Sequence, residues 1–157
     1  MRLFFLFFSL SFLMLYADVL GIDSSIARVY DFAYKSAQNT TTQLPKEREL
    51  FIVTFEKETS LIVNNYLAKL DPKYLDEQKA LFITDVSKIP SFMFKMFVVP
   101  QLQKYKHSVF VHQEEGLATV IPKREDAITL LFVAHGHIVK IAYATTQEEL
   151  QKAFEEP

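Results

Sequence analysis

The sequence predicts an α/β fold built on a mixed central sheet. Residues 50–55 and 80–85 are two β-favouring runs, and the segment between them has apolar residues at helical spacing. A crossover of this length makes the two strands parallel. Further along, residues 128–133 and 138–143 flank a short turn, which is typical of an antiparallel hairpin. Parallel and antiparallel strands in one chain predict a mixed sheet with helices packed on it.

The first crossover is predicted to contain two helical pieces. Apolar residues from Val63 to Leu70 repeat at helical spacing after a polar turn. Asp71 and Pro72 interrupt this helix and can begin a second piece over residues 73–79, because Asp caps helices well and Pro fits the first helical position.

A very apolar segment follows the second strand. Residues 91–105 predict a helix that must be covered on nearly all sides. Pro100 is expected to kink this helix or end it near Val99, because proline lacks a backbone N–H and clashes with the preceding turn. A third strand is predicted at residues 109–112, with a turn at 113–116.

The sequence predicts the C-terminal helix more clearly than the structure of residues 29–44. Thr146 and Glu149 have the spacing of a capping box, which predicts a C-terminal helix with Leu150 and Phe154 on its apolar face. Residues 29–44 alternate like strands but also match helical spacing, so their pattern alone leaves both structures open.

The first seventeen residues have the pattern of a signal peptide. Arg2 precedes an apolar run from Leu3 to Leu15, and Ala17 supplies a small residue for cleavage. The run is shorter than the roughly 20 residues that span a bilayer. We therefore expect residues 1–17 to be a signal peptide and residues 18–157 to be one domain, with an uncleaved, membrane-inserted N-terminus as the alternative.

The composition excludes several classes of function. The chain has 17 basic and 19 acidic residues, so it lacks the basic character of a nucleic-acid-binding protein. It has no cysteine, so no thiolate can act as nucleophile, redox centre or soft metal ligand. The fold must therefore be stabilised by a packed core without disulfides.

The element order and several loose motifs resemble the thioredoxin fold. The ending from Leu130 to Phe154 is similar to a thioredoxin C-terminus, and the segment from Phe82 to Pro90 matches a loose motif of such proteins. Residues 31–44 resemble the N-terminal hairpin of peroxiredoxin-like and periplasmic thioredoxin-like proteins. The resemblance implies a three-layer sandwich, with helices on both faces of the central mixed sheet and an N-terminal hairpin extension.

Within this group, the chain resembles short exported bacterial proteins of the YtfJ type, some of which are labelled flavin-containing dehydrogenases. A dinucleotide fold needs a glycine-rich turn after a strand to hold the pyrophosphate. The three glycines of this chain, Gly21, Gly116 and Gly136, are far apart. We therefore predict no cofactor.

The chain departs from the redox members of the fold at their active site. Where they have a C-x-x-C motif, this sequence has Glu56, Lys57, Glu58 and Thr59, and no proline stands at the position of their cis-proline. Neither the activity nor its catalytic residues carry over, and no catalytic residue is predicted. The turn at the start of the helix still exposes backbone N–H groups, so these four residues are a candidate partner-binding edge. A solvated helix cap is the alternative.

Two other features are candidate sites. His135 and His137 are weak metal-ligand candidates, joined by His112 if its strand lies nearby; exposed turn histidines are the alternative, because zinc sites need three or four ligands. In the apolar helix, Phe94 and Val98 are a candidate apolar contact, because they lie opposite the stripe of Phe92, Met96 and Val99 and one of the two faces is expected to stay exposed. Complete burial of both faces is the alternative.

These observations predict a non-catalytic, exported, periplasmic protein that binds another periplasmic protein or serves as an accessory to it. We expect no nucleic-acid partner, and contact with the membrane only through the signal peptide before cleavage. The alternative is a protein or enzyme that binds a small ligand, a flavin or a metal.

Overall fold

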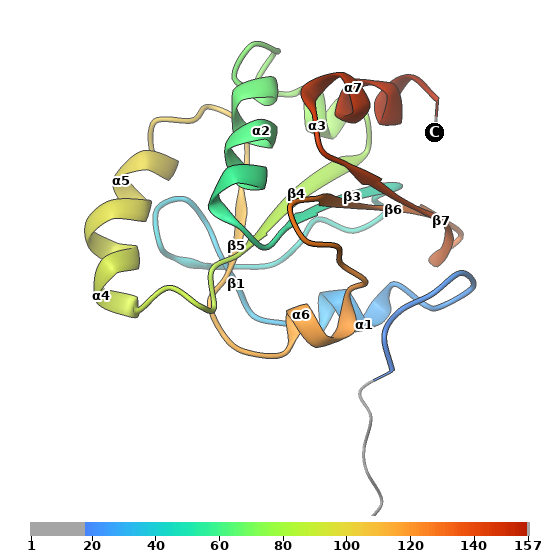
Figure 1. Ribbon diagram of the computed structural model, residues 1–157, viewed down its shortest axis with the longest axis horizontal. Coiled ribbons are helices and arrows are strands. Elements are labelled where there is room, and N and C mark those ends of the chain that lie inside the picture. Colours follow the sequence, from blue (N-terminus) through green and yellow to red (C-terminus); the bar gives the residue numbers. More distant parts are fainter. Residues whose placement is uncertain (1–17, 157) are drawn as a thin grey trace, which may run out of the picture.

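A computed structural model describes residues 18–156 of the chain, so the predicted signal peptide at residues 1–17 lies outside the described residues. Seven strands form one sheet in the order β2-β1-β5-β4-β3-β6-β7 (Figure 1). The strands are β1 (Tyr34–Lys35), β2 (Thr41–Thr42), β3 (Leu50–Thr54), β4 (Ala80–Asp85), β5 (Phe110–His112), β6 (Ile128–Ala134) and β7 (His137–Ala144).

The sheet is mixed, as predicted. Strands β3, β4 and β5 are parallel neighbours, with Thr54 beside Thr84 and Asp85 beside His112. Strand β6 runs antiparallel to both β3 and β7, and the β6–β7 pair is the predicted hairpin. The three parallel strands are buried at almost every position, which explains their continuous apolar runs.

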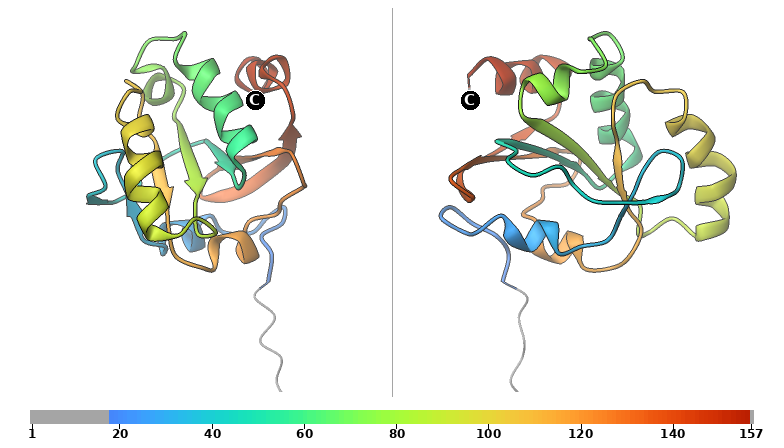
Figure 2. Two further views of the ribbon diagram at one scale, coloured as in Figure 1. Left: turned by 60° about the vertical axis from the view of Figure 1, so that its left-hand side comes forward. Right: turned by 180° about the vertical axis from the view of Figure 1, so that it is seen from behind.

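Helices cover both faces of the sheet, so the three-layer α/β arrangement is confirmed. Helices α2, α3 and α7 lie on one side in Figure 1, α1 and α6 lie on the other, and Figure 2 shows the same layers from two more directions. None of the helices formed by residues 18–156 has the length and apolarity needed to cross a bilayer. The helical segments are α1 (Ala27–Tyr30), α2 (Lys57–Leu67), α3 (Tyr74–Glu77), α4 (Ser91–Met93), the π-helical η1 (Phe94–Val98), α5 (Val99–Leu102), α6 (Leu117–Val120) and α7 (Gln147–Glu155).

Each face of the sheet has its own apolar core. On one face, alternate residues of β3 and β4 such as Ile52 and Phe82 pack with α2, α3, η1, α5 and α7. On the other face, Phe51 and Ile83 pack with α1, α6 and the first residues of the described chain. Alternation of side chains along a strand produces these two sets.

The ambiguous segment at residues 29–44 contains both structures that its pattern allowed. Helix α1 ends at Tyr30, and the β1–β2 hairpin follows and extends the sheet beside β5. Before α1, residues 23–25 run along the outer strand β7. The N–H of Asp23 donates to the carbonyl of Ile138 at 2.8 Å, and the N–H of Ile138 donates to the carbonyl of Ser24 at 2.9 Å.

Of the two effects expected of Pro100, an end of the apolar helix near Val99 is not found, because the helix continues to Leu102. The chain passes from α4 through the π-helical η1 into α5, where Pro100 occupies the first turn. In η1 the N–H of Val99 donates to the carbonyl of Phe94, five residues back. The wider turn of a π-helix changes the i to i−4 hydrogen-bond pattern before Pro100, which has no N–H to donate.

Candidate functional site

The carboxyl ends of the three parallel strands meet at one edge of the sheet, which we call the C-edge. Strand β3 ends at Thr54, β4 at Asp85 and β5 at His112. The register aligns these ends, so the turn after Thr54 and the start of α4 leave the sheet on the same side. Ligand sites of α/β folds commonly lie at such an edge.

The structure places Glu56, Lys57, Glu58 and Thr59, the candidate partner-binding edge, at the C-edge, before and within the first turn of α2. Lys57 and Glu58 are exposed, whereas Thr59 is buried and its hydroxyl donates to the carbonyl of Glu56 at 3.0 Å. Glu56 is the N-cap residue in an extended conformation, but its side chain makes no capping hydrogen bond. Its Oε2 is buried without a partner among the described residues. A partner could therefore reach Lys57 and Glu58 directly, and Glu56 in part, but not Thr59.

A cluster of hydroxyl groups that the sequence did not predict lies beneath this turn. The Ser60 hydroxyl bonds to Thr54 Oγ1 at 2.6 Å and to Thr84 Oγ1 at 2.8 Å. These bonds join β3, α2 and β4, so they fix the start of α2 on the sheet.

Further along α2, a buried histidine joins the helix to the chain before β5. His107 Nε2 bonds to Asn64 Oδ1 at 2.9 Å, and Asn64 donates to the carbonyl of Ser60 at 2.9 Å. Burial lowers the pKa of His107 from 6.5 to about 4, so the ring is neutral at physiological pH.

On the opposite face of the sheet, the C-edge contains a buried acid and a buried histidine. Asp85 accepts a hydrogen bond from the N–H of Ser87 at 2.8 Å, and His112 Nδ1 bonds to the carbonyl of Ala33 at 2.9 Å. Asp85 Oδ2 and His112 Nε2 have no partner among the described residues. Both side chains are buried and therefore closed to a substrate from solution.

Tyr34 completes this buried group. Its ring centroid lies 5.8 Å from that of His112, and its hydroxyl donates to the carbonyl of Val29 at 2.6 Å. Burial, with the charge of Asp85 as the second cause, raises the pKa of Tyr34. The phenol therefore stays protonated and acts as a hydrogen-bond donor that holds the β1–β2 hairpin onto α1.

The structure does not bring His112 to the other two metal-ligand candidates. His135 and His137 are both exposed at the tip of the β6–β7 hairpin, and His137 Nδ1 bonds to the carbonyl of His135 at 3.1 Å. His112 is buried on β5, which β4 and β3 separate from β6, so the suggestion that it lies nearby was wrong. Residues 18–156 contain no group of three or more histidine or acidic side chains placed to hold a metal ion.

The apolar helix does expose one face, but it is the face opposite to the one predicted. Phe94 is fully buried and Val98 packs against the core, so neither offers an apolar contact to a partner. Instead, four side chains on the outer side of α4 and η1 are exposed. Their exposed fractions are 67% for Phe92, 47% for Met93, 51% for Met96 and 58% for Phe97. We call these four residues the apolar face.

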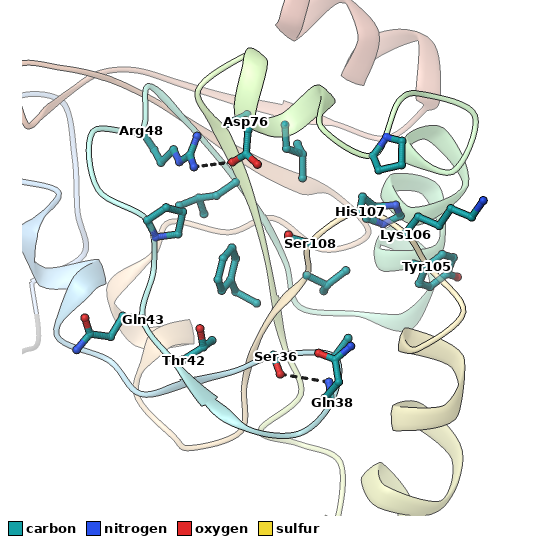
Figure 3. Close-up of a pocket in the computed structure, with 18 residues that line it drawn as sticks. Ser36, Gln38, Thr42, Gln43, Arg48, Asp76, Tyr105, Lys106, His107 and Ser108 are labelled. Atoms are coloured by element: carbon teal, nitrogen blue, oxygen red, sulfur yellow. Dashed lines mark hydrogen bonds and ion pairs between the residues drawn. The ribbon is translucent and has the colours of Figure 1, made fainter.

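A polar cleft of about 450 Å³ lies at the other end of the parallel strands (Figure 3). The N-terminal hairpin, including Ser36 and Gln43, forms one wall, and the chain entering β5 at Lys106 and Ser108 contributes another. Arg48 and Asp76, paired at 2.6 Å, line one end. Sequence analysis missed this cleft because its lining comes from separate segments that share no motif.

No protein-family model and no curated protein sequence matches the chain. Solved structures do resemble it. One is an uncharacterized thioredoxin-like protein from Porphyromonas gingivalis, with a TM-score of 0.53 and 15% identity over 80% of this chain and 88% of that one. Another is peroxiredoxin Q from Xanthomonas campestris, with a TM-score of 0.53 and 13% identity over 87% of this chain and 94% of that one. At such identities the likeness shows the fold alone. The protein therefore has a thioredoxin-like fold, in a chain without cysteine.

Proposed function

We propose that this protein is an exported, non-redox, thioredoxin-like binding protein that holds another protein at the C-edge. The observation that supports this most directly is the state of Glu56. One oxygen of its carboxylate is withdrawn from water without a donor, and the side chain does not cap its own helix. An unpaired buried carboxylate oxygen is costly, and because Glu56 as a residue is only half-buried, a rotation of its side chain would let a partner supply the missing donor.

The neighbouring residues suit such contact. Lys57 and Glu58 are exposed beside Glu56 and offer opposite charges to a partner. The chain has no cysteine at this edge, but it keeps the strands and the helix that position the cysteines of redox members of the fold. Without a thiol, the activity that this edge can still support is binding. The YtfJ-type resemblance and a periplasmic location belong to the same proposal.

Site-specific photo-crosslinking in the native cell tests the proposal. A crosslinking residue replaces Lys57 or Glu58, and a control replaces Lys152 on α7, away from the C-edge. We expect one specific protein to be captured from the edge positions and not from position 152. In the purified complex, Glu56→Gln should weaken affinity by about tenfold, because a charge-assisted bond is lost. Identical captures at both places, or no capture, would refute the proposal.

Export has its own test. N-terminal sequencing of the mature protein is expected to begin at or near Asp18. A chain that keeps Met1 and remains in the membrane fraction would contradict export.

The cleft supports a second candidate function, which is binding of a small ligand. Its volume lies in the usual range for small-molecule sites, and its lining offers hydroxyl, amide and charged groups. Native mass spectrometry of the purified protein distinguishes ligand binding from protein binding, because a retained ligand adds mass. Substitution of Ser108 and Gln43 should remove this added mass.

A further inference from the structure

The apolar face is the most concentrated exposure of large apolar side chains on the described surface. Residues 18–156 have eight exposed large apolar side chains, and four of them lie within six consecutive residues on α4 and η1. Such a concentration marks an interaction site, whereas single exposed apolar residues do not.

The packing beneath the helix fixes this face outward. Phe94 and Leu102 are buried in the core, and Val98 and Val99 pack against it from the same side. The exposed side chains therefore cannot turn inward without removing the buried ones. Figures 1 and 2 show the helix at the periphery of the molecule, with no other described element beyond it.

The segment that contains the apolar face carries only positive charge. From residue 86 to residue 113 the sequence contains no Asp or Glu, although the whole chain has a net charge of −2. The same segment has four lysines, all exposed, and none of them lies within ion-pair distance of a described carboxylate. These are Lys88, Lys95, Lys104 and Lys106.

We infer that this helix docks on the surface of a membrane containing anionic lipids. Phenylalanine and methionine side chains on one face of a helix enter the boundary between headgroups and acyl chains, and lysines beside them attract anionic headgroups. The apolar face lies on the outer side of a peripheral helix, which fits a deformable lipid surface better than a protein partner that must supply a matching groove. The helix is too short to span, so it would lie in the plane of the interface.

This inference concerns the mature chain and departs from the expectation that only the signal peptide contacts lipid. It uses a surface separate from Lys57 and Glu58. A protein held at the membrane by α4 and η1 would keep the C-edge residues of α2 available to a partner, so the two proposals can fail independently.

Vesicle flotation tests the inference. The chain from Asp18 to Pro157 is suitable because both apolar cores are built from residues 18–156. The probes are vesicles of phosphatidylcholine alone and of equal parts phosphatidylcholine and phosphatidylglycerol. We expect flotation with the second only, decreasing at high salt because screening weakens attraction to the headgroups.

Two sets of variants identify the groups responsible. The first variant has both Phe92→Ser and Phe97→Ser, and the second has Lys→Gln at all four lysines. Each variant should bind vesicles with an affinity lower by about tenfold or more. The matched controls are Val139→Ser, at another exposed apolar residue, and Lys→Gln at Lys46, Lys69, Lys73 and Lys152. The controls should bind like the unmodified chain, and circular dichroism should confirm that every variant is folded.

Three outcomes would overturn the inference. The first is equal flotation with both kinds of vesicle or with neither. The second is loss of binding in the lysine variant with full binding in the phenylalanine variant, since the apolar face would then not enter the bilayer. The third is unchanged flotation of the phenylalanine variant together with loss of a protein that a photo-crosslinker placed in the apolar face captures, which would identify a protein as the occupant.

Discussion

His107 shows how one buried residue links stability to pH. The folded protein holds its pKa at about 4, below the 6.5 of an exposed histidine, because burial disfavours the charged ring. Below the higher value the unfolded chain binds a proton that the folded chain does not. The contribution of His107 to the free energy of unfolding is therefore fully present above about pH 6.5 and decreases as the pH falls toward 4.

We expect the free energy of unfolding to decrease between about pH 7 and about pH 5, with His107 contributing on the order of 1–2 kcal/mol. Urea titrations across this range measure the change, and His107→Gln isolates it, because glutamine can still donate to Asn64 but does not titrate. An unchanged pH dependence in that variant would show that His107 is not the source.

For single residues, the sequence predicted where they lie in the fold better than what their side chains contact. Glu56 to Thr59 do lie at the start of α2 on the C-edge, because strand and helix periodicity locate that turn. The Asn64–His107 pair depends on how α2 packs against the chain before β5. No local pattern encodes that contact.

The apolar helix provides a matched pair of phenylalanines at the scale of one element. Phe94 is fully buried and Phe92 is mostly exposed, although only two residues separate them. We expect Phe94→Ala to lower the free energy of unfolding by about 3–5 kcal/mol and Phe92→Ala to change it by less than about 0.5 kcal/mol. Chemical denaturation of both variants tests this, and similar losses would mean that the burial assignment is wrong.

The last helix depends on its N-terminal cap. The Thr146 hydroxyl accepts a hydrogen bond from the N–H of Glu149 at 3.1 Å, and Glu149 Oε2 accepts one from the N–H of Thr145 at 2.6 Å. The return bond thus reaches one residue further upstream than in the usual capping box. We expect Thr146→Ala to cost about 1 kcal/mol and Thr146→Ser to cost much less, as measured by thermal unfolding. Equal losses would exclude a role for the hydroxyl.

Elements with strong periodicity could be predicted from the sequence. The β3, β4, β6 and β7 strands coincide with apolar runs, and the hairpin turn has positive φ at both His135 and Gly136, as two-residue turns require. The four-residue α6 was missed because it is too short to show a period. Helical spacing separated the two faces of the apolar helix correctly, but the exposed one was assigned wrongly, because periodicity alone does not say which apolar face meets the sheet.

On the scale of the whole molecule, the N-terminal segment protects an edge of the sheet. Residues 23–25 pair with the beginning of β7, and the N–H of Leu20 donates to the carbonyl of Val120 at 2.8 Å. Uncovered edge strands tend to pair with other chains. We expect a chain beginning at Ala27 to unfold at a lower temperature than one beginning at Asp18, and to form oligomers.

Size-exclusion chromatography with light scattering, together with thermal unfolding, measures both effects. A chain that begins at Asp18 and has Asp23→Asn serves as the control, because it keeps the backbone hydrogen bonds. Identical mass and melting temperature in the two chain lengths would show that the segment does not protect the edge.

The mixed sheet could be predicted from a parallel crossover and a final hairpin, and the resemblance to the thioredoxin fold implied the layers on its two faces. The cleft could not, because distant segments form its walls and no one of them has a distinctive pattern.

Because of the π-helical turn, the direction in which the apolar face points depends more on the number of residues in η1 than on which amino acids they are. Because an α-helix turns about 100° per residue, deleting one codon within residues 94–98 would rotate the first turn relative to Val99–Leu102 by roughly that angle. The exposed side chains of α4 would then point in a different direction relative to α5. A lineage could thus lose or gain this attachment in a single deletion or insertion while every remaining amino acid stayed the same.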